Sequence, residues 1–234
     1  MPNKTSATAR ARKIKLILFD VDGVLTDGKI WIFPAPSTVE TQLAASPAGA
    51  PSKLRLGGDV ATLQERTLLD RSAQQTAQGG FGFQSASLIE AKGFHAHDGT
   101  AISLARLAGL KTGLITKRIS ETVALRARDL KIDHVYQGIQ DKATVFRQIL
   151  DKEGITAAEA AFVGDDVIDL PAMRKCGFAV AVKNARAEVK AEAHWVTAHA
   201  GGDGAARDAV EYILKAQGKW KQVVAEYISE RSPK

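Results

Sequence analysis

The chain has 234 residues, of which 45% are hydrophobic, so it can bury the core of one α/β domain. Its formal net charge is +6, but Lys4, Arg10, Arg12 and Lys13 supply four of these charges within an acid-free N-terminal segment. The rest of the chain is close to neutral, which argues against a nucleic-acid-binding surface.

Residues 1–13 are predicted to form a basic flexible tail. The apolar run after them is too short for a signal peptide, and no run approaches the roughly 20 apolar residues of a membrane span. The single cysteine, Cys176, excludes an internal disulfide and a thiolate metal cage, and its apolar neighbours predict a packed side chain. We therefore expect a cytoplasmic protein without a membrane partner.

The first predicted strand is the apolar run 14–19, which leads directly into the sequence DVDGVLTDG at 20–28. Asp20 and Asp22 thus stand at the carboxyl end of a strand, the edge at which open α/β sheets bind ligands. Gly23 would let the backbone turn sharply close to such a ligand. An Asp-x-Asp pair can also be a solvated loop, so this interpretation needs partners elsewhere in the chain.

Strands over 30–33 and 87–94 are predicted to pair as a hairpin beside this edge. Residues 34–86 between them are rich in Pro, Ala, Ser, Gly, Thr and Gln and lack apolar periodicity, which predicts a long loop or disordered insertion at the hairpin tip. Within it, residues 59–78 could form a modest helix capped by Asp59. Loop-closure entropy grows only logarithmically with length, so extra chain costs little there.

From Asp98, which is expected to cap a helix, strands and helices alternate regularly and predict a parallel sheet with right-handed crossovers. Val123, Leu125 and Leu130 are expected to face inward from a helix over 119–130. The other predicted strands are 113–116, 132–135, 160–164, 178–182 and 194–196, and the other predicted helices are 142–153, 168–175, 185–192 and 203–217.

Polar residues after other predicted strands are expected to lie at the same sheet edge as the acidic motif at 20–28. Thr116 ends a strand, Lys142 begins a helix after the next strand, and Asp165, Asp166 and Asp169 follow the run AAFVG. Singly, these residues could be an N-cap, a solvated lysine and a helix N-terminus. Together they indicate a phosphoryl-transfer site, because a phosphoryl group in transit is stabilised mainly by positioning and electrostatics.

The chemistry expected of this site needs Mg²⁺, since carboxylates alone would repel a phosphoryl group. Asp20 and Asp165 would bind the cation through carboxylates and Asp22 through its carbonyl. Asp20 would attack phosphorus, while Asp22 would protonate the leaving alkoxide and then deprotonate the hydrolytic water. Thr116 and Lys142 would hold phosphate oxygens.

The motif at 20–28, Thr116, Lys142 and GDDVID at 164–169 resemble the four motifs of the haloacid dehalogenase-like phosphatase superfamily. The resemblance runs from about residue 13 to 220 apart from the insertion. It implies a Rossmannoid parallel sheet with helices on both faces, capless, with a β-hairpin flap that carries the insertion. It also implies a single domain over 14–220 and a C-terminal tail over 221–234.

More narrowly, the chain is similar to the 3-deoxy-D-manno-octulosonate 8-phosphate phosphatases through VDGVLTDG, HDG at 97–99, YQGIQDK at 136–142 and GGDGAARDAVEYIL at 201–214. This similarity implies a homotetramer whose subunits cover each other's sites, with 201–207 as an inter-subunit element. Gly201 and Gly202 could instead be ordinary glycines of a loop before a helix. Arg126 could be a solvated helix residue. The similarity assigns these residues to the sugar-phosphate pocket: Asp22, His95, His97, Asp98, Gly99, Arg118, Arg126, Lys142 and Arg207.

Three positions depart from the family pattern, with Lys117 at a usual glycine and His97 and Ser103 at usual arginines. Serine does not replace a bidentate arginine contact, so the substrate stays open between octulosonate 8-phosphate, a nonulosonic acid 9-phosphate and another sugar phosphate. A receiver-type signalling domain is disfavoured by the order of the motifs. A catalytically silent oligomerisation module of the same fold is the remaining alternative.

Overall fold

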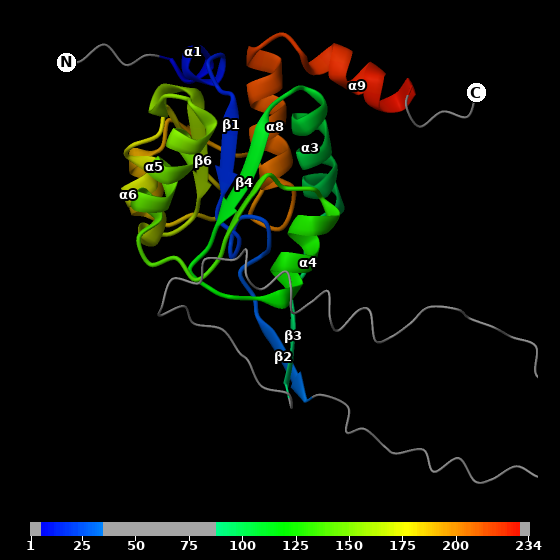
Figure 1. The fold of residues 1–234 in the computed structure, drawn as a ribbon, viewed down its shortest axis with the longest axis vertical. Helices are drawn as coiled ribbons and strands as arrows, with labels where there is room; N and C mark the ends of the chain where they lie inside the picture. Colours follow the sequence, from blue (N-terminus) through cyan, green and yellow to red (C-terminus); the bar gives the residue numbers. More distant parts are fainter. Residues whose placement is uncertain (1–5, 35–87, 230–234) are drawn as a thin grey trace, which may run out of the picture.

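The computed structural model describes residues 6–34 and 88–229, which form an α/β fold around a parallel sheet (Figure 1). Every pair of neighbouring strands in this sheet is parallel, as the alternation of strands and helices predicts. The strands, in spatial order, are β5 (His134–Tyr136), β4 (Lys111–Ile115), β1 (Leu16–Phe19), β6 (Ala160–Gly164), β7 (Phe178–Ala181) and β8 (Trp195–Val196).

Helices cover both faces of the sheet, with α3, α4 and α8 on one side and α5 and α6 on the other (Figure 1). Two 3₁₀ turns, Ala157–Glu159 and Val167–Asp169, flank β6. The helices are α1 (Ala7–Ala11), α3 (Ala96–Leu107), α4 (Glu121–Asp129), α5 (Lys142–Glu153), α6 (Leu170–Met173), α7 (Ala187–Glu192), α8 (Ala205–Ala216) and α9 (Trp220–Ser229). Among the described residues, none of them combines the length and the apolar character that crossing a bilayer requires.

Strand β1 lies at the centre of the sheet, between β4 and β6, and all four of its residues are buried. Phe19 is in register with Leu114 on β4 and with Val163 on β6. Because the three strands are parallel and in register, their carboxyl ends meet at one edge. This register brings together the polar residues that follow them.

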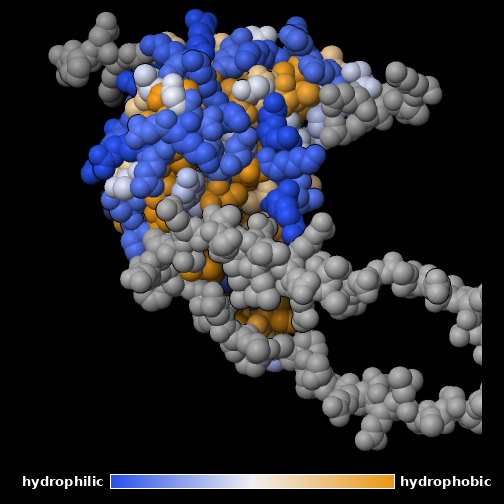
Figure 2. Space-filling model, viewed as in Figure 1, coloured by the Kyte–Doolittle hydropathy of each residue, from blue (hydrophilic) through white to orange (hydrophobic). Residues whose placement is uncertain are grey.

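The predicted hairpin is present: β2 (Trp31–Pro34) pairs antiparallel with β3 (Leu88–Ala91). It projects from the edge toward which the β1 arrow points (Figure 1). About half of the Trp31 and Phe33 surface is exposed, at 54% and 48%, and apolar colouring marks the hairpin in Figure 2. The remainder of the expected insertion and the helix expected over 59–78 lie outside the described residues.

The expectation that Asp98 caps its own helix is wrong. Helix α3 begins at Ala96, which leaves Asp98 inside the first turn. Its carboxylate instead accepts hydrogen bonds from the backbone N–H groups of Gly204 (3.3 Å) and Arg207 (2.8 Å). Asp98 therefore caps α8, whose own N-cap residue, Gly204, has no side chain to do so.

The inward placement of Leu125 is also wrong, because its side chain is 55% exposed. Helix α4 buries Val123 and Ala127, which lie four residues apart and so share one face. Leu125, two residues from each, points away from that face. Leu130 is partly buried against the core, in agreement with the prediction.

Both expected tails contain helices that pack on the core. At the N-terminus, Ser6 caps α1 and Ala11 is completely buried, so a flexible tail over 1–13 is wrong for the described part. At the C-terminus, α9 occupies most of 221–234 and buries Val223. Cys176 is buried as expected, and burial raises the pKa of its thiol to about 12.

Candidate active site

The loop after β1 is a tight turn pressed against β6. The Asp20 backbone N–H donates to the carbonyl of Val163 (3.0 Å), which continues the strand pairing up to the acidic motif. The backbone then turns at Gly23, whose φ is +97°. A Cβ at this position would lie 2.2 Å from Oδ2 of Asp165, so only glycine lets the loop lie against that carboxylate.

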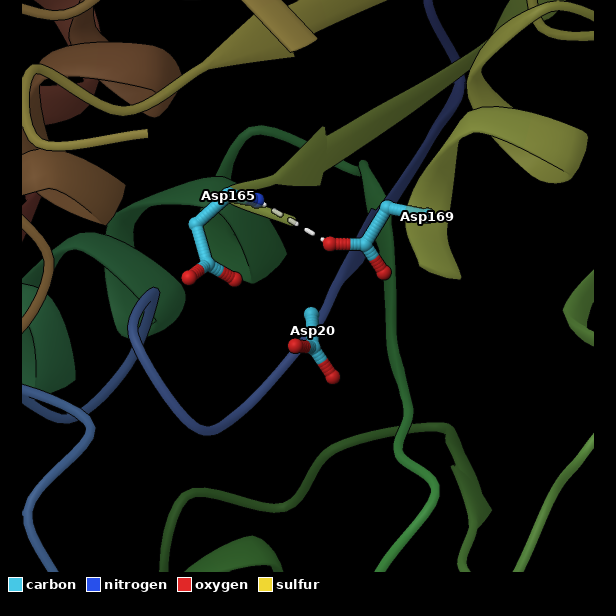
Figure 3. Close-up of side chains that lie close together, drawn as sticks. All are labelled: Asp20, Asp165 and Asp169. Carbon is cyan, nitrogen blue, oxygen red and sulfur yellow. Dashed lines mark hydrogen bonds between the residues drawn. The ribbon is translucent and has the colours of Figure 1, made fainter. Parts of the chain in front are cut away.

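Three carboxylates meet at this edge of the sheet. Asp20, Asp165 and Asp169 each offer an oxygen within 4.8 Å of the others, and Figure 3 shows the three carboxyl groups around a common space. The two carboxylates predicted to share a cation are therefore close enough to do so.

A buried lysine links two of these carboxylates. The Lys142 ammonium donates to Oδ1 of Asp20 (2.7 Å) and to Oδ1 of Asp169 (2.6 Å). The other oxygen of Asp169 accepts the N–H groups of Asp165 (3.0 Å) and Asp166 (3.3 Å). Asp169 therefore positions both Lys142 and the backbone that carries Asp165 and Asp166. Sequence reasoning placed it in the acidic run without a role, although its spacing of three from Asp166 fits a capping box.

The cluster carries more negative than positive charge. Burial raises the pKa of Asp165 to about 8, and the neighbouring carboxylates add to the rise. Burial also raises the pKa of Asp20 to about 7, against the opposing effect of Lys142. Burial would lower the pKa of Lys142, but Asp20 and Asp169 together raise it. Three carboxylates thus face one ammonium, an arrangement that a divalent cation would neutralise.

The donor set fits such a cation. Within the described part of the chain, Oδ1 of Asp165 is buried and has no hydrogen-bond partner, an arrangement that is costly unless a ligand satisfies it. Carboxylate oxygens are the ligands that hard divalent cations such as Mg²⁺ prefer. Asp20 and Asp165 are the natural ligands, since both oxygens of Asp169 are already occupied.

The cluster opens into a pocket of about 340 Å³, large enough for a small phosphorylated molecule. Thr116, buried at the end of β4, is one of its walls. Lys142 is hydrogen-bonded to Asp20 but is not among the residues that line the pocket, so its contact with phosphate stays a prediction. The lining residues are Asp20, Asp22, Thr116, Lys117, Arg118, Asp165, Asp166 and Ile168.

Asp22 is held by two cations, Lys92 and Arg118, which also contact a second carboxylate, Glu90. The buried ammonium of Lys92 donates to Oδ1 of Asp22, and Nε of Arg118 lies 3.8 Å from Oδ2. Glu90 lies against both cations, 3.9 Å from the Lys92 ammonium and 3.4 Å from an Arg118 amino group. Sequence reasoning missed Glu90 and Lys92. Their spacing of two residues, which places both on one side of an extended strand, was the available signal.

Other residues assigned to the sugar-phosphate pocket lie apart from it within this chain. His95, Asp98, Gly99 and Arg126 line a separate cavity of about 10 Å³, room for no more than about one water molecule. The exposed His97 lies outside both cavities, and its ring meets that of His95 edge to face, with 4.8 Å between centroids. Their contact with substrate stays a prediction.

Arg207 also lies outside the pocket. Its guanidinium pairs with Glu211 (3.1 Å) and lies over the ring of Trp220 at 4.8 Å. The glycines before it pack on the loop of residues 20–28 of the same chain, which we call the catalytic loop. A Cβ at Gly201 would come within 1.6 Å of the Gly23 carbonyl oxygen. This contact explains the glycine within one chain, and an inter-subunit role for 201–207 stays a prediction.

The fold and the acidic site agree with the comparison to known families. A family model described as haloacid dehalogenase-like hydrolase matches residues 14–177. The chain belongs to this family, and the curated relatives described below are phosphatases. It is therefore a phosphoric monoester hydrolase.

Its relatives include the 3-deoxy-D-manno-octulosonate 8-phosphate phosphatases KdsC. The protein of Escherichia coli (strain K12) is 31% identical over 218 residues, which cover 93% of this chain and 88% of that protein. The protein of Yersinia pestis is 36% identical over 210 residues, covering 90% and 84%. Sequence reasoning had indicated this similarity.

A solved structure shows the same fold with ligands bound. The phosphatase from Moraxella catarrhalis, in complex with magnesium ion, phosphate ion and a KDO molecule, has a TM-score of 0.69 and 28% identity. The match covers 94% of this chain and 97% of that one. A cobalt-bound enzyme from Haemophilus influenzae has a TM-score of 0.64 and 27% identity, covering 92% and 99%.

Proposed function

We propose that this protein hydrolyses 3-deoxy-D-manno-octulosonate 8-phosphate, with Mg²⁺, through an aspartyl-phosphate intermediate. The observation that carries the proposal is the meeting of Asp20 and Asp165 at the mouth of a pocket, with Lys142 bound to Asp20. The KdsC relatives and the KDO complex from Moraxella catarrhalis support the substrate.

In the first step, the Asp20 carboxylate attacks phosphorus and the bond from phosphorus to the sugar oxygen breaks. Asp22 gives its proton to that oxygen, and the sugar leaves as an alcohol. Lys142 holds Oδ1 of Asp20 at 2.7 Å, which orients the other carboxylate oxygen for the attack.

In the second step, Asp22 takes a proton from water as the water oxygen attacks the phosphorus of the intermediate. The bond from phosphorus to Asp20 breaks, and inorganic phosphate is released with both aspartates restored. Thr116, buried beside the pocket, would donate its hydroxyl to a phosphate oxygen throughout.

Mg²⁺ would be held by the carboxylates of Asp20 and Asp165 and by the carbonyl of Asp22. When bound, the cation would neutralise charge on the phosphoryl group and on the cluster.

The pocket suits a substrate with a second anionic group. Lys117 and Arg118 both line it, so a sugar carboxylate in the pocket would meet two cationic side chains. Ser103, at a position where the family usually has arginine, bonds the Gly99 carbonyl (3.3 Å) and lies outside this pocket. Lys117 and Arg118 are therefore the candidates to recognise the carboxylate.

We further propose that the protein is a cytoplasmic homotetramer. The exposed apolar side chains of the hairpin, Trp31, Phe33 and Ile89 among them, support burial against another subunit. Light scattering after gel filtration measures the mass, and a monomer at micromolar concentration would contradict this assembly.

The test is hydrolysis of a panel of sugar phosphates, with Mg²⁺ and after treatment with a chelator. We expect the highest kcat/KM for octulosonate 8-phosphate and no turnover without a divalent cation. Preference for a nonulosonic acid 9-phosphate, or for a sugar without a carboxylate, would replace the substrate. No activity on any phosphate ester would favour a silent oligomerisation module.

A further inference from the structure

Lys92 is a buried cation at the site that the steps above do not use. Its side chain has no exposed surface, and its ammonium contacts Oδ1 of Asp22. Burying an ammonium costs several kcal/mol unless nearby charges and hydrogen bonds compensate. The compensating partners are Asp22 itself and, 3.9 Å away, Glu90.

The hairpin holds Lys92 against the catalytic loop. Lys92 follows β3 directly, and two residues later Phe94 forms an isolated antiparallel bridge with Thr26. Thr26 belongs to the same loop as Asp22. The backbone is therefore fixed on both sides of Lys92, by the pairing of β3 with β2 before it and by the Phe94 bridge after it.

Glu90, which contacts the Lys92 ammonium, is itself held in place by residues at and before the start of α4. The Ser120 hydroxyl donates to Oε1 of Glu90 (2.5 Å), and the Thr122 hydroxyl donates to its backbone carbonyl (3.2 Å). An Arg118 amino group donates to Oε2 (3.4 Å). Glu90 is thereby anchored to the start of α4, and its two oxygens face the two cations beside Asp22.

We propose that Lys92 is a positioning residue for the general acid and base. By binding Oδ1 of Asp22, it fixes the rotation of the carboxyl group so that Oδ2 carries the proton to and from the reacting oxygen. The longer contact of Oδ2 with Arg118, at 3.8 Å, leaves that oxygen accessible to the pocket that Asp22 lines. This inference rests on the proposed function, since it assumes that Asp22 exchanges the proton.

The role predicts an effect that depends on the leaving group. A sugar alkoxide is a poor leaving group and needs the proton from Asp22, whereas 4-nitrophenolate is stable as an anion and leaves without one. A misoriented Asp22 therefore slows phosphoryl transfer from an alkyl phosphate far more than from 4-nitrophenyl phosphate.

The experiment is single-turnover kinetics with excess full-length enzyme and Mg²⁺, which isolates the first step for both substrates. For Lys92→Met we expect a loss of about 10- to 100-fold on the sugar phosphate and less than about threefold on 4-nitrophenyl phosphate. Lys92→Arg should recover part of the loss. Equal losses on both substrates, or no loss on either, would overturn the proposal.

Two further variants secure the result. Adding Lys92→Met to Asp22→Asn should cause little further loss on the sugar phosphate, because the lysine acts through the aspartate; an additive loss would contradict this route. Glu90→Gln, which leaves the lysine in place, should show a smaller loss with the same dependence on the leaving group, and a uniform loss would count against the network.

The matched control is Lys29→Met, which removes an exposed lysine at the start of the same hairpin. It should leave both rates within about twofold of wild type. The sugar phosphate for these measurements is the one that wild-type enzyme prefers in the substrate panel described above. If wild-type enzyme hydrolyses none of the panel, the proposed function is refuted. Wild type that turns one over, with a uniform loss in Lys92→Met, refutes the positioning role alone.

Discussion

Two clusters at the same sheet edge each contain a buried lysine between carboxylates, but their charges differ. The acidic cluster sets Asp20, Asp165 and Asp169 against one ammonium, and the pKa values of Asp20 and Asp165 are raised by burial to about 7 and about 8. The second, which we call the hairpin cluster, consists of Asp22, Glu90, Lys92 and Arg118, two carboxylates and two cations.

The difference indicates what each cluster is for. A set of buried charges with surplus negative charge is costly by itself and gains from binding a cation. A balanced set is satisfied within the protein and can hold a side chain in one orientation. The acidic cluster is thus suited to bind metal and phosphoryl group, and the hairpin cluster to orient Asp22.

The largest expected effect is on activity in the acidic cluster. Asp20→Asn removes the nucleophile and should lower kcat for the preferred sugar phosphate by about 10⁴-fold or more. The matched control is Asp27→Asn in the same loop, whose exposed carboxylate pairs only with nearby Lys29 in the described structure. Activity that survives equally in Asp20→Asn would rule out a covalent intermediate.

The next largest expected effect is on stability, and it differs between the two buried lysines, Lys142 and Lys92. Lys142→Met leaves Asp20 and Asp169 without a cation and should lower the free energy of unfolding by about 3 kcal/mol. That corresponds to a fall in Tm of about 6–12 °C by calorimetry. Lys92→Met should cost less, because Arg118 still faces Asp22 and Glu90.

Lys152→Met, on the exposed face of the same helix as Lys142, is the control and should change Tm by no more than about 2 °C. A fall in Lys92→Met as large as that in Lys142→Met would remove the distinction between the clusters.

Mg²⁺ should stabilise the protein through the acidic cluster alone. At a concentration 100 times its Kd, a ligand that binds only the native state adds about 2.7 kcal/mol, or about 5–10 °C in Tm. Asp165→Asn should abolish this response, whereas Glu90→Gln should keep it. A response lost equally in both variants would show that the hairpin cluster also holds the cation.

The smallest expected effect concerns Asp98, whose carboxylate is hydrogen-bonded to backbone N–H groups and belongs to neither cluster. Asp98 accepts two backbone N–H groups at the start of α8, so Asp98→Ala should cost about 1 kcal/mol, as the loss of a helix cap does. Urea denaturation measures this cost. The Mg²⁺ response should remain unchanged, and its loss would connect this position to the site.

The sequence alone was enough for the elements with strong local signals. The helix over 142–153 and the strand over 160–164 were predicted with the observed bounds, because an amphipathic period and an unbroken apolar run define them. The acidic motifs likewise predicted a site at one edge of the sheet, because residues that follow adjacent parallel strands lie together at the carboxyl ends of those strands. Similarity to known phosphatases followed from the same motifs.

Tertiary structure decided the partners of individual side chains. Asp98 caps a helix more than 100 positions along the chain, and Lys92 and Glu90 reach Asp22 only because a hairpin folds back on the catalytic loop. Helix α1 is too short to be stable alone and forms because Ala11 is buried on the core. Periodicity reports which face of an element is buried, but the partner of a buried charge depends on segments that are distant in the sequence and meet only in the folded chain.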